Sequence, residues 1–216
     1  MATLKDFRHQ YSAELLMQAS AQTAPGALYD WVGLTHRRLD PVGLNIAYEL
    51  LDAVAAKTMV TDLLAAPLVS TQFASLDLTK EVKAEADVQL PNVLPELQAS
   101  LDTSKVVSFS FEGVNSRSMP AELRLQIRAL LAQLREQNAR KYRQRIRPFM
   151  VVDNLFYATR VVITLKAGTK LSAAAELAAK SAPGGKVSVT TGSDMVISYN
   201  QPDCPFAAEF TKGKEL

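Results

Sequence analysis

Pro67 separates two patterns of apolar residues, and the contrast between them limits the fold more than any other feature of the chain. Before Pro67 the apolar residues recur mostly at helical spacing. Asp40 and Pro41 suit the N-cap and the first position of a helix, so the sequence predicts a helix from there up to Pro67. After Pro67 the apolar residues alternate with polar ones or cluster in β-branched and aromatic stretches. Residues 1–66 are therefore expected to be mainly helical, and residues 78–211 to form a sheet.

Alternation is clearest in residues 80–90, where apolar and polar side chains exchange places at every position. A period of two is typical of a strand with one face in water. The apolar members would share one face of that strand, and they are Val82, Ala84, Ala86, Val88 and Leu90. Residues 105–111 form a second predicted strand, in which Val107, Phe109 and Phe111 are expected to lie inside.

The second part of the chain also predicts one long helix and further strands. The helix is expected over about residues 120–146, because leucine and isoleucine form an apolar stripe along it. Residues 154–166 are rich in β-branched and aromatic side chains and predict a strand. Residues 186–199 predict a hairpin. Residues 171–181 fit a helix by propensity and a strand by alternation, and both readings stay open.

Together these segments predict a single α+β domain over residues 1–216, with a twisted antiparallel sheet, flanking helices and a helical N-terminal third. A chain of 216 residues is long enough to bury a substantial core. Its apolar fraction of 48% and charged fraction of 21% are ordinary for a globular protein. A net charge of +2 excludes a uniformly basic nucleic-acid binder, but it leaves room for a local basic patch.

Residues suited to catalysis or metal binding are few and scattered. The chain has one cysteine, Cys204, and two histidines, His9 and His36, which show no metal-ligand spacing. A lone cysteine cannot close an internal disulfide. No glycine loop of the phosphate-binding type precedes a helix, and no set of nucleophile, base and orienting group stands out. We therefore expect no catalytic, cofactor-binding or metal-binding residues, no cofactor and no enzymatic turnover.

The beginning of the chain does not have the pattern of a signal peptide. Lys5, Arg8 and His9 are not followed by an apolar stretch. No window of the sequence reaches the roughly 18 uncharged apolar residues that a spanning helix needs. The expected location is therefore the cytoplasm.

The most distinctive group of functional candidates in the sequence is a basic run at the end of the predicted long helix. Glu136 is the only acid within residues 135–147. The cations are Arg135, Arg140, Lys141, Arg143, Arg145 and Arg147. They suit a solvated helix end, where cations face the negative end of the macrodipole. They equally suit contact with an anionic surface, either lipid headgroups or nucleic-acid phosphates.

The order of segments in residues 78–211 resembles the pore-forming domain of gasdermins, particularly the bacterial ones. It runs from the alternating stretch through residues 106–113 (VVSFSFEG), the leucine helix with its basic end and residues 155–162 (LFYATRVV) to the closing hairpin and residues 205–210 (PFAAEF). The resemblance implies a twisted antiparallel sheet with flanking helices. It also implies a protein of bacterial defence and cell death that assembles as a homo-oligomer on a membrane.

In this interpretation two strand pairs extend into β-hairpins that line a pore, after the chain moves from the cytoplasm to the inner face of the cell membrane. Pore hairpins alternate a lipid face with a wet face. The candidates for insertion are Val82, Ala84, Ala86, Val88, Leu90, Val187, Val189 and Val196. Residues 171–181, small and low in charge, would change conformation.

Two other functions stay open at this point. The first is a non-enzymatic structural or adaptor subunit of a larger assembly, which would bind other protein subunits through the helical N-terminal part. The second, less favoured, is a nucleic-acid-binding subunit that uses residues 135–147. Tyr142 is the only aromatic residue inside that run, so the sequence offers little support for base stacking.

Overall fold

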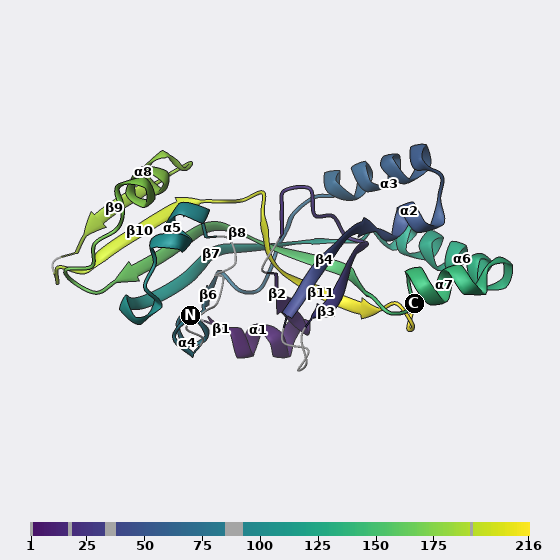
Figure 1. The fold of residues 1–216 in the computed structure, drawn as a ribbon, viewed down its shortest axis with the longest axis horizontal. Helices are drawn as coiled ribbons and strands as arrows, with labels where there is room; N and C mark the ends of the chain where they lie inside the picture. Colours follow the sequence, from purple (N-terminus) through teal and green to yellow (C-terminus); the bar gives the residue numbers. More distant parts are fainter. Residues whose placement is uncertain (1, 17–18, 33–37, 85–92, 191) are drawn as a thin grey trace. The chain divides into compact units, whose positions relative to one another are not determined.

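The computed structural model describes residues 2–16, 19–32, 38–84, 93–190 and 192–216 (Figure 1). Helices flank an 11-stranded sheet, so the expected α+β class is confirmed. The chain divides into two compact units. Unit 1 consists of Met1–Tyr11, Ser70–Asn115 and Tyr157–Cys204, and unit 2 consists of Ser12–Val69, Ser116–Phe156 and Pro205–Leu216. A single domain over residues 1–216 stays a prediction.

Unit 1 is built on the strand order β1-β6-β7-β8-β10-β9 (Figure 1). These strands are β1 (Ala2–Thr3), β6 (Ser75–Asp77), β7 (Val106–Ser118), β8 (Met150–Leu165), β10 (Met195–Asn200) and β9 (Lys186–Val189), of which β7 and β8 continue into unit 2. The pairs β6–β7, β8–β10 and β9–β10 are antiparallel, whereas β1 and β6 are parallel. The helices are α1 (Leu4–Tyr11), α4 (Thr79–Ala84), α5 (Pro95–Ser100) and α8 (Ala173–Ser181), with a 3-10 turn over Thr103–Lys105.

Unit 2 contains four further strands and four helices. The strands are β2 (Ala13–Leu15), β3 (Ala27–Val32), β4 (Arg38–Asn45) and β11 (Pro205–Lys212). The helices are α2 (Ile46–Leu50), α3 (Ala53–Ala65), α6 (Ala121–Gln137) and α7 (Ala139–Arg145). A short strand, β5 (Val69–Ser70), pairs with β7. Ile46, Leu63, Ile127, Leu131 and Val151 belong to one buried cluster, so α2, α3, α6 and β8 share a core.

The helical content of the N-terminal third is confirmed in α1, α2 and α3, but the predicted helix start at Asp40 and Pro41 is wrong. Both residues lie in β4, where Pro41 is paired with Tyr29 of β3. Among the described strands β4 pairs with β3 alone. Proline lacks the N–H that a second neighbouring strand would bind, so it is tolerated on an outer strand such as β4. The helix begins instead after Asn45, whose side chain accepts a backbone hydrogen bond and caps α2.

The strand predicted over residues 80–90 is wrong in its first half, where the structure has helix α4. Asp77 favours the helix start, because its carboxylate accepts a hydrogen bond of 2.9 Å from the backbone N–H of Thr79. Leu78 and Val82 are four residues apart and both are buried, so one helix face satisfies the apolar pattern. Val82 and Ala84 therefore lie in a helix, whereas Ala86, Val88 and Leu90 lie outside the described residues.

The other predicted strands are confirmed as β7, β8 and the β9–β10 hairpin. Phe109 and Phe111 are fully buried, as expected, and their rings contact each other edge to face. The inward position of Val107 is wrong, because this side chain is 37% exposed and Val106 is the buried residue at the start of β7. Residues 171–181, left open by the sequence, contain helix α8, which Ser172 caps at its N-terminus.

No helix in the described ranges combines the length and the apolar composition that crossing a membrane requires.

Candidate functional site

The basic run lies at the end of α6 and along α7, close to the C-terminus of the chain (Figure 1). The long helix predicted over residues 120–146 is therefore present but divided. Ile127 and Leu131 of α6 are buried in the core of unit 2. Asn138 ends α6 with backbone angles of −147° and 69°, and its side chain accepts a hydrogen bond from the backbone N–H of Lys141. Asn138 thus both breaks the long helix and caps its second part.

Tyr142 anchors α7 in the protein, and Arg135 is bound to it. The Tyr142 hydroxyl donates to the carbonyl oxygen of Gly213 at 2.9 Å. The Arg135 guanidinium donates to the same hydroxyl at 2.9 Å, and its central carbon lies 4.5 Å from the centre of the Tyr142 ring. A cation over an aromatic face is stabilised by the ring quadrupole. Arg135 therefore has a role inside the fold.

Lys141 is also engaged within the protein. Its ammonium donates to the carbonyl oxygen of Glu49 at 2.6 Å and lies 3.8 Å from the carboxylate of the same residue. Glu49 belongs to α2, so this contact ties α7 to the helix that follows β4. Of the predicted anion contacts, Arg135 and Lys141 thus hold α7 in place, and their contact with an anionic surface stays a prediction.

The remaining cations of the run are exposed, and we call them the arginine cluster. Its members are Arg140, Arg143, Arg145 and Arg147. Arg143 donates to the carbonyl oxygen of Ala139 at 3.2 Å, one turn earlier in α7. No ion pair within the described part of the chain joins a member to an acid. The C-terminal end of α7 favours cations, but that preference leaves their charge available to solvent or to a ligand.

The candidate insertion residues of the hairpin do not form one apolar stripe. Val187 is paired with Ile197, and Val189 with Met195, so these four share one face of β9–β10. Val196 is paired with Ser188 and faces the other way. Val189 is 68% exposed, whereas Val187 and Val196 are half-buried. Their insertion into a membrane stays a prediction.

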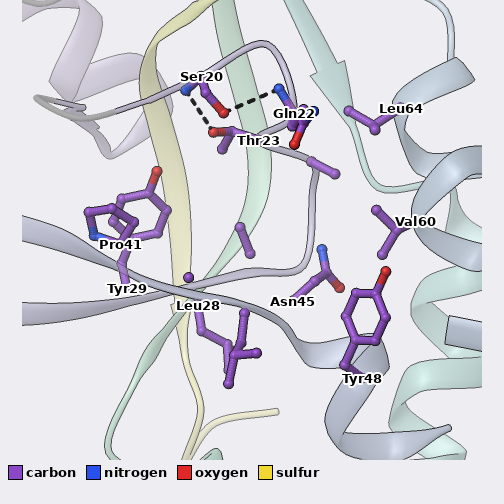
Figure 2. Close-up of a pocket in the computed structure, with 14 residues that line it drawn as sticks. Ser20, Gln22, Thr23, Leu28, Tyr29, Pro41, Asn45, Tyr48, Val60 and Leu64 are labelled. Carbon is purple, nitrogen blue, oxygen red and sulfur yellow. Dashed lines mark hydrogen bonds between the residues drawn. The ribbon is translucent and has the colours of Figure 1, made fainter. Parts of the chain in front are cut away.

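A cavity of about 520 Å³ in unit 2 is a feature that the sequence did not indicate (Figure 2). The loop before β3, the β3–β4 hairpin, α2 and α3 line it, and none of the lining side chains is charged. The Asn45 amide is already occupied, because it donates to the carbonyl oxygen of Pro25 at 2.9 Å and accepts from the backbone of α2. The cavity therefore has no charged group with which to attract an ion.

Cys204, the lone cysteine of the chain, is partly buried. Burial raises the pKa of its thiol to about 11, so the group is protonated at neutral pH and is a poor nucleophile. His9 lies exposed on α1, and His36 lies outside the described residues. In the ranges that the structure describes, no group of three or more His, Cys, Asp or Glu is arranged to hold a metal ion.

We expect Tyr142→Phe to destabilise unit 2 by about 1–3 kcal/mol, because it leaves the Gly213 carbonyl and the Arg135 guanidinium without their shared partner. Urea unfolding would measure the loss. Tyr48→Phe is the matched control, since Tyr48 is 43% exposed and should change stability by no more than about 0.5 kcal/mol. Equal losses in the two variants would show that Tyr142 does not anchor α7.

Comparison with known proteins finds similarity among solved structures. No family model matches the chain, and no curated protein matches it. Among solved structures, the chain is similar to that of a bacterial gasdermin from Bradyrhizobium tropiciagri, with 13% sequence identity and a TM-score of 0.44. The similarity covers 93% of this chain and 82% of the gasdermin chain. A likeness at this level is a weak resemblance, and it agrees with the one noted from the sequence.

Proposed function

We propose that this chain binds anionic lipid bilayers through the arginine cluster and assembles there into a gasdermin-like pore. The observation that carries the proposal is the set of exposed arginines on and after α7, which have no acidic partner in the described part of the chain. Each cation near an anionic membrane surface contributes about 1 kcal/mol of binding free energy. Three of its members lie on α7, whose position is fixed by the contacts of Tyr142 and Lys141.

Two connections in unit 1 are suited to lengthen into hairpins. Residues 78–105 join the antiparallel neighbours β6 and β7, and residues 166–194 join the antiparallel neighbours β8 and β10. The first connection contains α4 and α5, and the second contains α8 and β9. A helix that converts into a strand needs a sequence compatible with both states. Residues 80–84 and 171–181 meet this condition, because each alternates like a strand yet contains helical residues.

Assembly into a closed ring of many copies follows from the chemistry of the bilayer. Strands inside hydrocarbon need every backbone N–H and C=O paired, and only a closed barrel leaves no edge. A hairpin from one chain cannot meet that condition alone. The proposed active form is therefore a homo-oligomer, located at the inner face of the cell membrane. We propose that its pore acts in defence by cell death.

A liposome-leakage assay tests the proposal. The purified chain would be added to dye-loaded vesicles of phosphatidylglycerol and phosphatidylcholine, and to matched vesicles of phosphatidylcholine alone. We expect dye release from the anionic vesicles and little from the neutral ones, since the arginine cluster is the proposed contact. Binding without release would contradict pore formation but retain the lipid contact. Binding to random RNA without binding to anionic vesicles would favour the nucleic-acid alternative, and binding to neither would favour a subunit of a protein assembly.

The proposed activity is non-enzymatic. Binding and assembly need no nucleophile, and the protonated thiol of Cys204 is consistent with a structural role for that residue. No cofactor enters the proposal.

A further inference from the structure

The cavity of unit 2 has the size of a ligand site, and the proposed function does not use it (Figure 2). Its volume of about 520 Å³ lies inside the range of about 300–1,000 Å³ that is typical of small-molecule sites. All of its lining residues belong to unit 2. Pro41, Gly43 and Tyr48 are exposed parts of the lining, so a ligand can reach the cavity from solvent.

One wall of the cavity is apolar. Leu28 of β3 is buried, and Val60 and Leu64 of α3 are half-buried against the same core. Figure 2 shows Val60 and Leu64 pointing from α3 toward the cavity. Such a wall favours a ligand with an aromatic or aliphatic body, because contact removes apolar surface of both partners from water.

Hydroxyl and amide groups line the cavity as well. The hydroxyl oxygens of Ser20 and Thr23 accept backbone hydrogen bonds of 3.2 Å from Gln22 and 3.0 Å from Ser20 (Figure 2). Each hydroxyl still has its own hydrogen to donate. The Asn45 side chain is 7% exposed and gives one amide hydrogen to the carbonyl oxygen of Pro25. Its second amide hydrogen has no partner among the described residues, so it can donate to a ligand.

The Asn45 side chain is held in position before any ligand binds. Its amide nitrogen donates to Pro25 while its oxygen accepts from the backbone of α2, so both ends are fixed. Gly26 lies so close that a Cβ at this position would be 2.8 Å from the same oxygen. Backbone hydrogen bonds from Gly26 to Val152, and from Ile46 to Gly26, tie this loop to β8 and α2. A preformed site loses little conformational entropy on binding, which favours affinity.

The chemistry of the lining indicates the charge of the ligand. The lining side chains that the structure describes are aliphatic, aromatic, hydroxyl and amide groups. Hydrogen bonds from such groups can compensate the lost hydration of a neutral polar atom. They compensate a full charge only in part, because the hydration of an ion is far stronger. The lining therefore suits an uncharged molecule better than an ion of the same shape.

We propose that this cavity binds an uncharged small molecule with an aromatic or aliphatic body and a hydrogen-bond-accepting end. The body lies against Leu28, Val60 and Leu64, and the accepting end receives a hydrogen bond from the Asn45 amide. The site goes beyond the proposed function, since neither the lipid contact nor the assembly uses these residues.

Three probes with the same ring test the preference for a neutral ligand. Benzamide is uncharged, benzoate is an anion and benzamidine is a cation at neutral pH. Each is titrated into the isotope-labelled full chain while amide NMR signals are recorded. We expect benzamide to shift the backbone signals of Gly43 and Leu64 and the side-chain signal of Asn45, with a Kd of about 10 mM or below. Benzoate and benzamidine should bind at least about tenfold more weakly.

Two substitutions on one helix locate the site. Val60→Phe places a ring in the cavity, so it should abolish the saturable benzamide shifts at Asn45. Val54→Phe is the matched control, because it makes the same change on α3 at a side chain that is 78% exposed and lies outside the lining. Its Kd for benzamide should equal that of the natural chain. The three-probe comparison needs no variant, so it decides the question even if Val60→Phe does not fold.

Several results would overturn the proposal. Benzamide could give no saturable shift, or the three probes could bind equally well. The benzamide shifts could also spread over the whole surface of the chain, or persist unchanged in a folded Val60→Phe variant. Either of these last results would place the binding outside the cavity.

Discussion

Replacing Arg143, Arg145 and Arg147 with glutamine is expected to weaken partitioning onto anionic vesicles about a hundredfold. Each lost cation removes about 1 kcal/mol of attraction to the membrane surface, and every 1.4 kcal/mol is about a factor of ten in the binding constant. The three side chains are exposed and have no acidic partner in the described ranges, so little of their charge is already compensated. Vesicle co-sedimentation at fixed lipid composition measures the partition coefficient directly.

Salt provides an independent check on the same contact. The Debye length shortens from about 10 Å at 0.1 M to about 3 Å at 1 M salt, so attraction through the arginine cluster should fall steeply over that range. The triple variant should show a much weaker salt dependence than the natural chain, since fewer cations remain to be screened.

The matched control removes the same charge from another place. Lys105, Lys166 and Lys170 are exposed in unit 1, and their replacement with glutamine lowers the net charge by the same amount. If both triple variants lose equal affinity, net charge rather than the arginine cluster drives binding. The fold of each variant should be retained, because exposed substitutions usually change stability by no more than about 0.5 kcal/mol.

The sequence shows that the cations cluster at the end of a helix, but it does not show which of them are bound within the protein. The leucine stripe predicted α6 correctly, but nothing in it indicated the break at Asn138 that divides the predicted helix into α6 and α7. The partner of Lys141, however, is Glu49, 92 positions away, and Tyr142 reaches Gly213, 71 positions away. Such pairs depend on how the elements pack, and no local pattern in residues 135–147 indicates them.

Errors in the predicted elements have a common physical cause. Short apolar patterns fit more than one secondary structure, and capping or pairing then decides between them. Asp77 favours a helix at α4, although the residues after it alternate. Pairing with β3 places Pro41 in a strand, although an Asp-Pro pair suits a helix start. The cavity escaped prediction for another reason, because a loop, two strands and two helices line it together and no single local pattern indicates it.

Phe109→Ala is expected to cost about 3–5 kcal/mol of unfolding free energy, which is a large share of the 5–15 kcal/mol typical of a domain. Phe109 is fully buried in β7, and its ring centre lies 5.3 Å from that of Phe111 in an edge-to-face contact. Alanine leaves a cavity at this position and removes the ring contact, which alone contributes about 0.5–1.5 kcal/mol. Urea unfolding of both chains, with the slope compared as well as the midpoint, measures the loss.

Val107→Ala on the same strand is the control for Phe109→Ala. Val107 is 37% exposed, and its replacement with alanine removes fewer buried atoms. The loss of unfolding free energy should therefore be well below that of Phe109→Ala. The comparison tests the side-chain directions in β7 that the sequence pattern predicted wrongly at Val107 and correctly at Phe109. If Val107→Ala proved as costly as Phe109→Ala, Val107 would lie in the core and the side-chain directions described above for β7 would be incorrect. If Phe109→Ala cost less than about 1 kcal/mol, the surrounding side chains would be able to close around the missing ring.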